Sequence, residues 1–144
     1  MFDLNTFNHF TEIQIRFKDI DAQGHVNNAN HLTYAEVARV EYFKKVLGEN
    51  INWNKTGLLL ARTEIDYLEP IFLNDSVSVS SSVGRLGTKS FDMYNLIFKN
   101  TSNGQKTSAK IKSVFVCYDY ELKSSIMVPE EWRLNFIKFE KHLN

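Results

Sequence analysis

Hydrophobic and polar residues alternate along several stretches of this chain and repeat with a helical period along one of them. Residues 12–17 alternate in this way, which predicts a strand. Over residues 28–47 the apolar side chains cover about two-thirds of a helical circle, counted at about 100° per residue. This wide apolar arc predicts a helix that other structure largely covers. The helix should end before Gly48, a residue type that commonly terminates helices.

Strands and one more helix follow this predicted helix. The predicted strands are residues 58–69, 76–83, 89–99 and 107–120, and the predicted terminal helix is 129–142. Short links such as Asn103-Gly104 favour antiparallel neighbours. The order predicts an α+β protein, in which a five-stranded antiparallel sheet wraps around one long central helix. We expect a single domain over residues 1–144, whose long last strand offers an edge to a second chain.

Composition and charge remove several classes of protein from consideration. The formal net charge is +0, so no overall field favours nucleic acid. Cys117 is the one cysteine, so the chain forms no internal disulfide. No apolar run approaches the roughly 20 residues of a membrane span, and the first residues lack the pattern of a signal peptide. We therefore expect a cytoplasmic protein without a membrane span or a nucleic-acid partner.

Hydrogen-bonding residues crowd the segment DIDAQGHVNN, residues 19–28, immediately before the predicted helix. The N–H groups of a first helical turn lack intrahelical partners and carry partial positive charge. Asn27 or Asn28 is the simplest N-cap for this helix. Gly24 permits a sharp turn and a close approach of substrate to the backbone. Such a helix start can hold the negative charge that develops on a reacting oxygen.

The run DAQGHVNN, residues 21–28, resembles the hotdog-fold acyl thioesterases of the 4-hydroxybenzoyl-CoA thioesterase type. It is also similar to the D-x-N-x-H-V-N-N run of plant acyl-carrier-protein thioesterases, which have asparagine at the position of Gln23. The residues that extend the resemblance are Tyr34, Glu36, Ala38, Arg39 and the run at 64–70. The resemblance implies a hotdog fold and hydrolysis of acyl-CoA without a cofactor, because coenzyme A is part of the substrate. It also implies a homodimer or homotetramer with active sites at the subunit interface.

The resemblance assigns a role to each candidate site residue. Asp21 would act as general base or as nucleophile, and the backbone N–H of Asn28 would donate to the oxyanion. Burial beside the helix would make Asp21 a better base. His25 either takes part as acid or base or hydrogen-bonds within the loop. Substrate would be bound by Gly24, Asn27, Tyr34 and Lys89.

Other polar residues have a structural and a functional interpretation. Asp19 is interpreted as structural, and His31 as a packed histidine, because no partner stands at a zinc-ligand spacing. Glu36 and Arg39 can pair on the helix, although Glu36 is an alternative base. Arg62, Arg85, Lys89, Lys110 and Lys112 are solvated charges or contacts for the phosphates of coenzyme A. The aromatic residues that form core or an acyl tunnel are Phe91, Tyr94, Phe98 and Phe115.

Four functions therefore remain open on the sequence. Hydrolysis of acyl-CoA is the leading hypothesis. The lack of a strongly basic stretch favours coenzyme A over the acidic acyl carrier protein as the carrier of the acyl group. A thioesterase acting on acyl-carrier-protein substrates is the close variant. A non-catalytic acyl-thioester binding protein need not keep Asp21. A hotdog dehydratase would release an enoyl product and no thiol, so a thiol assay separates it from a thioesterase.

Overall fold

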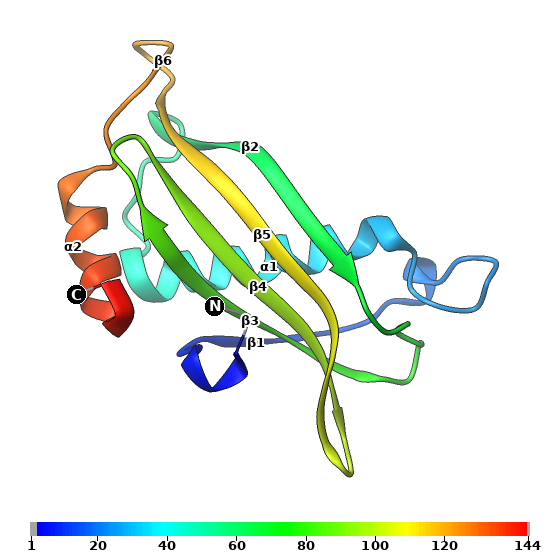
Figure 1. Cartoon of the computed structure of the whole chain (residues 1–144). Helices are drawn as coiled ribbons and strands as arrows, with labels where there is room; N and C mark the ends of the chain where they lie inside the picture. Colours follow the sequence, from blue (N-terminus) through cyan, green and yellow to red (C-terminus); the bar gives the residue numbers. More distant parts are fainter. Residues whose placement is uncertain (1–2, 144) are drawn as a thin grey trace.

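The computed structural model describes residues 3–143, in which a curled antiparallel sheet packs one face against a long helix (Figure 1). The sheet runs in the order β1 (Phe10–Ile13), β3 (Ser76–Leu86), β4 (Ser90–Thr101), β5 (Gly104–Asp119) and β2 (Thr56–Tyr67). The two-residue strand β6 (Ser124–Ser125) pairs with β5. The helices are α1 (Asn28–Leu47) and α2 (Glu130–Phe139), with 3-10 turns η1 (Leu4–Thr6), η2 (Phe17–Asp19) and η3 (Lys141–Leu143).

The predicted α+β architecture and the central helix are confirmed. Helix α1 begins at Asn28 and ends at Leu47, before Gly48, whose φ is +87°. The predicted terminal helix is shorter than expected, because α2 ends at Phe139 and η3 follows. In the turn between β4 and β5, Gly104 has a φ of +106°, which a glycine adopts without the cost that other residues meet.

Three expectations from the sequence are wrong. The first strand is β1, residues 10–13 rather than 12–17, because the Asp19 carboxylate accepts the Arg16 backbone N–H at 3.0 Å and turns the chain into η2. The last long strand, β5, lies inside the sheet between β4 and β2, so the free edges belong to β1 and β2. The helix is not largely covered within this chain, since Leu32, Val37 and Val40 are exposed.

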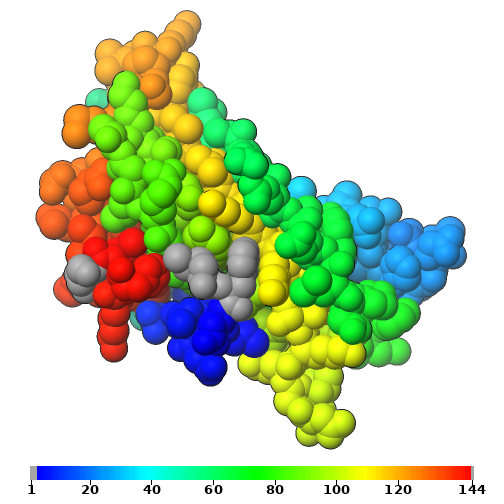
Figure 2. All heavy atoms as spheres, in the orientation of Figure 1, coloured from blue at the N-terminus to red at the C-terminus, as the bar shows by residue number. Residues whose placement is uncertain are grey.

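Helix α1 packs mainly against one half of the sheet face, the half formed by β1, β3 and β4. It contacts β1, β3 and β4, whereas β2 lies along one margin of the sheet face seen in Figure 2. Leu60 and Tyr67 of β2 stay exposed, although their sheet partners Phe115 and Ala109 are buried. The margin of the sheet along β2 therefore carries exposed apolar side chains.

A polar band divides the core into an aromatic and an aliphatic cluster. The aromatic cluster includes Tyr42, Phe43, Phe91 and Phe136, and the aliphatic cluster includes Val26, Val79, Ile97 and Ile111. Between the clusters, the Asn95 side-chain amide donates to the Ser81 hydroxyl at 2.8 Å. The hydroxyls of Thr63 and Ser113 lie 3.3 Å apart in the same band. These hydrogen bonds satisfy polar groups that burial would otherwise leave at a cost.

Candidate active site

A tight loop carries Asp21 to the start of α1. Ile20 and Val26 pair across the loop as an antiparallel bridge. The Asp21 N–H donates to the His25 carbonyl at 3.1 Å, and the Gly24 N–H donates to the Asp21 carbonyl at 3.0 Å. Gly24 has a φ of +83° and open space around it, so conformation rather than crowding demands glycine there. The loop is held by its own backbone, which fixes where Asp21 stands.

The Asp21 carboxylate lies beside the helix cap and remains partly open to solvent. Its Oδ1 accepts the Gln23 N–H at 2.8 Å, and its Oδ2 lies 3.4 Å from the Asn27 side-chain amide. The side chain is half-buried within the single chain. The long contact leaves Oδ2 able to accept a further hydrogen bond, for instance from a water molecule.

The first turn of α1 leaves one backbone donor free beside this carboxylate. Asn27 is the N-cap, because its Oδ1 accepts the Ala29 N–H at 3.0 Å. Asn28 is the first helical residue, and within the described chain its N–H donates to no acceptor. The Tyr67 hydroxyl donates to the Asn28 carbonyl at 3.1 Å and so ties the first turn to the end of β2. The helix start therefore presents an unpaired, exposed N–H, as first-turn geometry dictates.

A pocket of about 200 Å³ adjoins this free amide, and we call it the amide pocket. Its lining comes from the loop, α1 and the end of β2: His25, Val26, Asn28, His31, Tyr67, Leu68, Glu69 and Pro70. His31 is buried, as predicted, and its ring meets the Tyr67 ring edge-on at 5.0 Å. Burial lowers the pKa of His31, so its imidazole is neutral at pH 7. The His25 ring lies 6.4 Å from Phe72 at the pocket wall.

A buried ion pair supports the loop from behind. Asp19 is only 1% exposed and accepts hydrogen bonds from the Arg16 guanidinium at 2.8 Å and from the Tyr34 hydroxyl at 2.8 Å. Burial alone would raise the pKa of Asp19, but the bonds from Arg16 and Tyr34 outweigh it and lower that pKa. The structural interpretation of Asp19 therefore agrees with its contacts. Tyr34 faces Asp19 rather than the amide pocket.

The remaining candidates lie apart from Asp21 within one chain. Lys89 stands at the β3–β4 turn, where its ammonium lies 3.4 Å from the Ser125 carbonyl, far along the sheet from the loop (Figure 1). Glu36 is exposed and pairs with Arg39 at 3.3 Å, as the spacing predicted. Arg85 and Lys112 share the Asp92 carboxylate, and Arg62 pairs with Glu64. The aromatic candidates that are fully enclosed in the protein are Phe91, Phe98 and Phe115.

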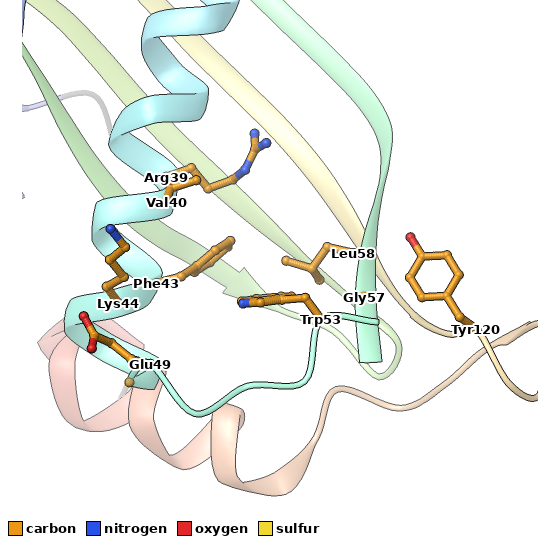
Figure 3. A pocket seen from close by; sticks show the side chains of 10 residues that line it. Arg39, Val40, Phe43, Lys44, Glu49, Trp53, Gly57, Leu58 and Tyr120 are labelled. Atoms are coloured by element: carbon orange, nitrogen blue, oxygen red, sulfur yellow. The ribbon is translucent and has the colours of Figure 1, made fainter. Parts of the chain in front are cut away.

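A second and larger pocket, of about 510 Å³, opens between the C-terminal half of α1 and β2 (Figure 3). We call it the distal pocket, and its main walls are Arg39, Phe43, Trp53 and Leu58. The sequence reasoning missed it, since Trp53 lies in the connection after α1, where no periodic pattern assigns a side chain to a face. The one signal was an exposed loop with a large aromatic residue, a residue type that often marks a binding surface.

Within residues 3–143, no three histidine, cysteine, aspartate or glutamate side chains gather closely enough to hold a metal ion. In the same part of the chain, no helix combines the length and the apolar character needed to cross a membrane.

Known proteins share this architecture. A curled antiparallel sheet packed on a long helix is the hotdog fold. A thioesterase-superfamily protein from Jannaschia sp. CCS1 superposes with a TM-score of 0.85 at 20% identity, covering 95% of this chain and 86% of that one. Residues 15–136 match the thioesterase-like superfamily, and the chain belongs to that family.

More similar relatives are thioesterases or lack an assigned activity. A thioesterase from Thermus thermophilus, solved with coenzyme A and zinc, is 33% identical with a TM-score of 0.82, covering 96% of this chain and 98% of that one. The long-chain acyl-CoA thioesterase FadM of Escherichia coli K12 is 25% identical over 126 residues, covering 85% of this chain and 92% of FadM. The uncharacterized protein YsmA of Bacillus subtilis 168 is 28% identical over 93 residues. That match covers 63% of this chain and only 61% of YsmA.

Proposed function

We propose that this protein hydrolyses acyl-CoA thioesters, with Asp21 as the general base or nucleophile and the Asn28 N–H as the oxyanion donor. One observation carries the proposal: the Asp21 carboxylate stands beside the cap of α1, whose first N–H is unpaired and adjoins a pocket. The Thermus relative that binds coenzyme A and the FadM relative, an acyl-CoA thioesterase, support the substrate class. Because no strongly basic surface stretch is present in the sequence, coenzyme A fits better than an acidic carrier protein.

The chemistry requires a single water molecule. With Asp21 as base, the carboxylate takes a proton from water while the water oxygen bonds to the thioester carbon. The carbonyl oxygen becomes an oxyanion that the Asn28 N–H stabilises, a contribution of about 10²–10³ in rate for one donor. The carbon–sulfur bond then breaks, and the proton passes to the departing thiolate. Asp21 acting instead as nucleophile would form an anhydride that water opens, and the overall products are the same acid and thiol.

Neighbouring groups fit this scheme without joining the proton transfer. The neutral, buried His31 and the Tyr67 hydroxyl brace the peptide that follows the Asn28 amide. His25 lines the pocket and offers an imidazole that can orient water. Cofactors have no place in the scheme, since coenzyme A enters as part of the substrate.

Release of free thiol from a panel of acyl-CoA thioesters tests the proposal. The Asp21→Asn variant should fold normally and lose at least about 10²-fold in kcat/KM, because the amide cannot accept the proton. Asp66→Asn is a matched control, since Asp66 is an exposed acid on β2 outside both pockets, and its activity should equal wild type. Substrates that bind without thiol release would favour a non-catalytic binding protein, and an enoyl product would favour a dehydratase. Either result refutes the proposal that the protein hydrolyses acyl-CoA thioesters.

A further inference from the structure

The amide pocket and the distal pocket lie on one face of α1. At about 100° per residue, Asn28, Leu32, Ala35, Arg39 and Phe43 fall within a sector of roughly 80°. This stripe faces β2, which lines the amide pocket near its end and the distal pocket near its beginning. The proposed reaction centre and the larger pocket therefore lie near opposite ends of α1 and β2.

Arg39 places a mostly buried positive charge in the distal pocket. Its side chain is 21% exposed, and the guanidinium stacks over the Phe115 ring at 4.7 Å from the ring centre. Its ion-pair partner is Glu36, which touches it at 3.3 Å and is itself 64% exposed. Burial lowers the pKa of Arg39, although a guanidinium stays protonated at neutral pH. With five N–H donors and one loosely held partner, this guanidinium keeps most of its capacity for an anion.

The other residues that line the distal pocket are mostly apolar, and its two other charged residues, Lys44 and Glu49, are exposed and lie near each other. The rings of Phe43 and Trp53 lie 6.0 Å apart, and Leu58 completes the wall on β2. Figure 3 shows the Arg39 guanidinium reaching from α1 toward β2 above these side chains. Lys44, at the rim, is already paired with Glu41 at 2.9 Å. Mostly apolar walls around one available, mostly buried guanidinium, with Lys44 and Glu49 at the exposed rim, suit a ligand with a hydrocarbon body and a terminal carboxylate.

We propose that the distal pocket binds the far end of the acyl group and that Arg39 binds a carboxylate there, so that long ω-carboxyacyl thioesters are substrates. This inference rests on the proposed function of Asp21. Arg39 is 11 residues beyond Asn28, which is about 16 Å along α1 at about 1.5 Å per residue. An extended chain gains about 3.5 Å per three bonds, so an acyl chain of about 14 bonds spans this distance.

Paired substrates isolate the contribution of the terminal carboxylate. We would measure kcat/KM for tetradecanedioyl-CoA and for tetradecanoyl-CoA, which differ only at the far end. In Arg39→Gln the ratio of the two values should fall by about 10-fold to 100-fold, the worth of a lost charge-assisted hydrogen bond. In the control Lys44→Gln, which removes a positive charge from the rim of the same pocket, the ratio should stay at its wild-type value. In Arg39→Lys the ratio should recover in part, because a cation remains.

If wild type and Arg39→Gln show the same ratio of kcat/KM for the two thioesters, the inference is overturned. The proposed function still stands in that case, provided that both proteins hydrolyse both thioesters. Absence of thiol release from every thioester refutes the proposed function instead. A titration of the free diacid then decides about Arg39 separately, followed by the tryptophan fluorescence of Trp53 in the pocket wall and its neighbour Trp132. Tetradecanedioic acid should bind wild type at least about 10-fold more tightly than Arg39→Gln, whereas tetradecanoic acid should bind both equally. Equal binding of the diacid overturns the inference.

Discussion

Replacing Asp19 by asparagine removes the charge at the centre of the ion pair behind the loop that carries Asp21. Four donors reach the Asp19 carboxylate: the Arg16 backbone N–H at 3.0 Å, its Nε at 3.1 Å, its Nη2 at 2.8 Å and the Tyr34 hydroxyl at 2.8 Å. An asparagine keeps one acceptor oxygen and turns an NH₂ group toward some of these donors. The variant therefore loses about two charge-assisted bonds in a buried place.

The expected loss in the free energy of unfolding is about 2–4 kcal/mol at pH 7. Each bond to a charged group contributes about 1.5–3 kcal/mol, and we take the low end because the Arg16 side chain is half-exposed. For a chain of this size, 1 kcal/mol shifts the Tm by about 2–4 °C, so the Tm should fall by about 5–15 °C. Urea denaturation followed by tryptophan fluorescence measures the difference. The control is Asp21→Asn, the same change at a half-exposed acid in the same loop, which should stay within about 0.5 kcal/mol of wild type.

The difference in the free energy of unfolding between wild type and Asp19→Asn should depend on pH, and this dependence is a second test. The pKa of Asp19 is lower in the folded protein than its usual value of about 3.9. Its contribution to stability is therefore complete above about pH 4 and disappears as the pH falls through the lowered pKa. Wild type and Asp19→Asn should differ by a constant amount from pH 5 to pH 8 and converge below about pH 4. A gap under about 0.5 kcal/mol at pH 7, or a full gap that persists in acid, would refute the reasoning.

Three further predictions concern the helix cap, a buried hydrogen bond and the one cysteine. Asn27→Ala removes the side chain that accepts the Ala29 N–H, so denaturation should show a loss of about 1 kcal/mol; no loss would mean that water replaces the cap. In Tyr42→Phe, the fully buried Glu140 carboxylate loses a donor at 2.7 Å, which should lower the free energy of unfolding by about 1.5–3 kcal/mol in the same assay. Burial raises the pKa of the Cys117 thiol to about 11, so an aromatic disulfide reagent should leave the native protein unlabelled at pH 8 and label one thiol per chain in denaturant.

Local patterns in the sequence predicted most of the elements. The helical period and Gly48 gave both ends of α1, since capping and amphipathicity act over a few residues. The order of strands in the sheet was beyond such patterns. β5 was expected at an edge. Instead β2, which precedes β3 in the chain, pairs with the side of β5 that faces away from β4, and the paired residues are about 50 apart in the chain.

The candidate site divides in the same way. The loop from Asp21 to Asn28 is local, so the placement of its carboxylate beside the helix cap followed from residues that the sequence holds together. Tyr34 was expected to bind substrate, but its hydroxyl meets Asp19, a partner set by the packing of α1 against the preceding loop. The distal pocket depends on how far β2 stands from α1, which no property of either segment specifies.

The polar band of Ser81, Asn95, Thr63 and Ser113 has a consequence for motion. At this band, hydrogen bonds rather than apolar contacts join the aromatic half and the aliphatic half of the core, which are the two clusters described above. The two halves can therefore open separately. The aliphatic half, which carries Val26 of the loop, can loosen while the rings around Phe136 stay locked. Amide hydrogens near the loop should therefore exchange with deuterium before those of the aromatic half, because the loop opens at a lower free energy than the aromatic half does.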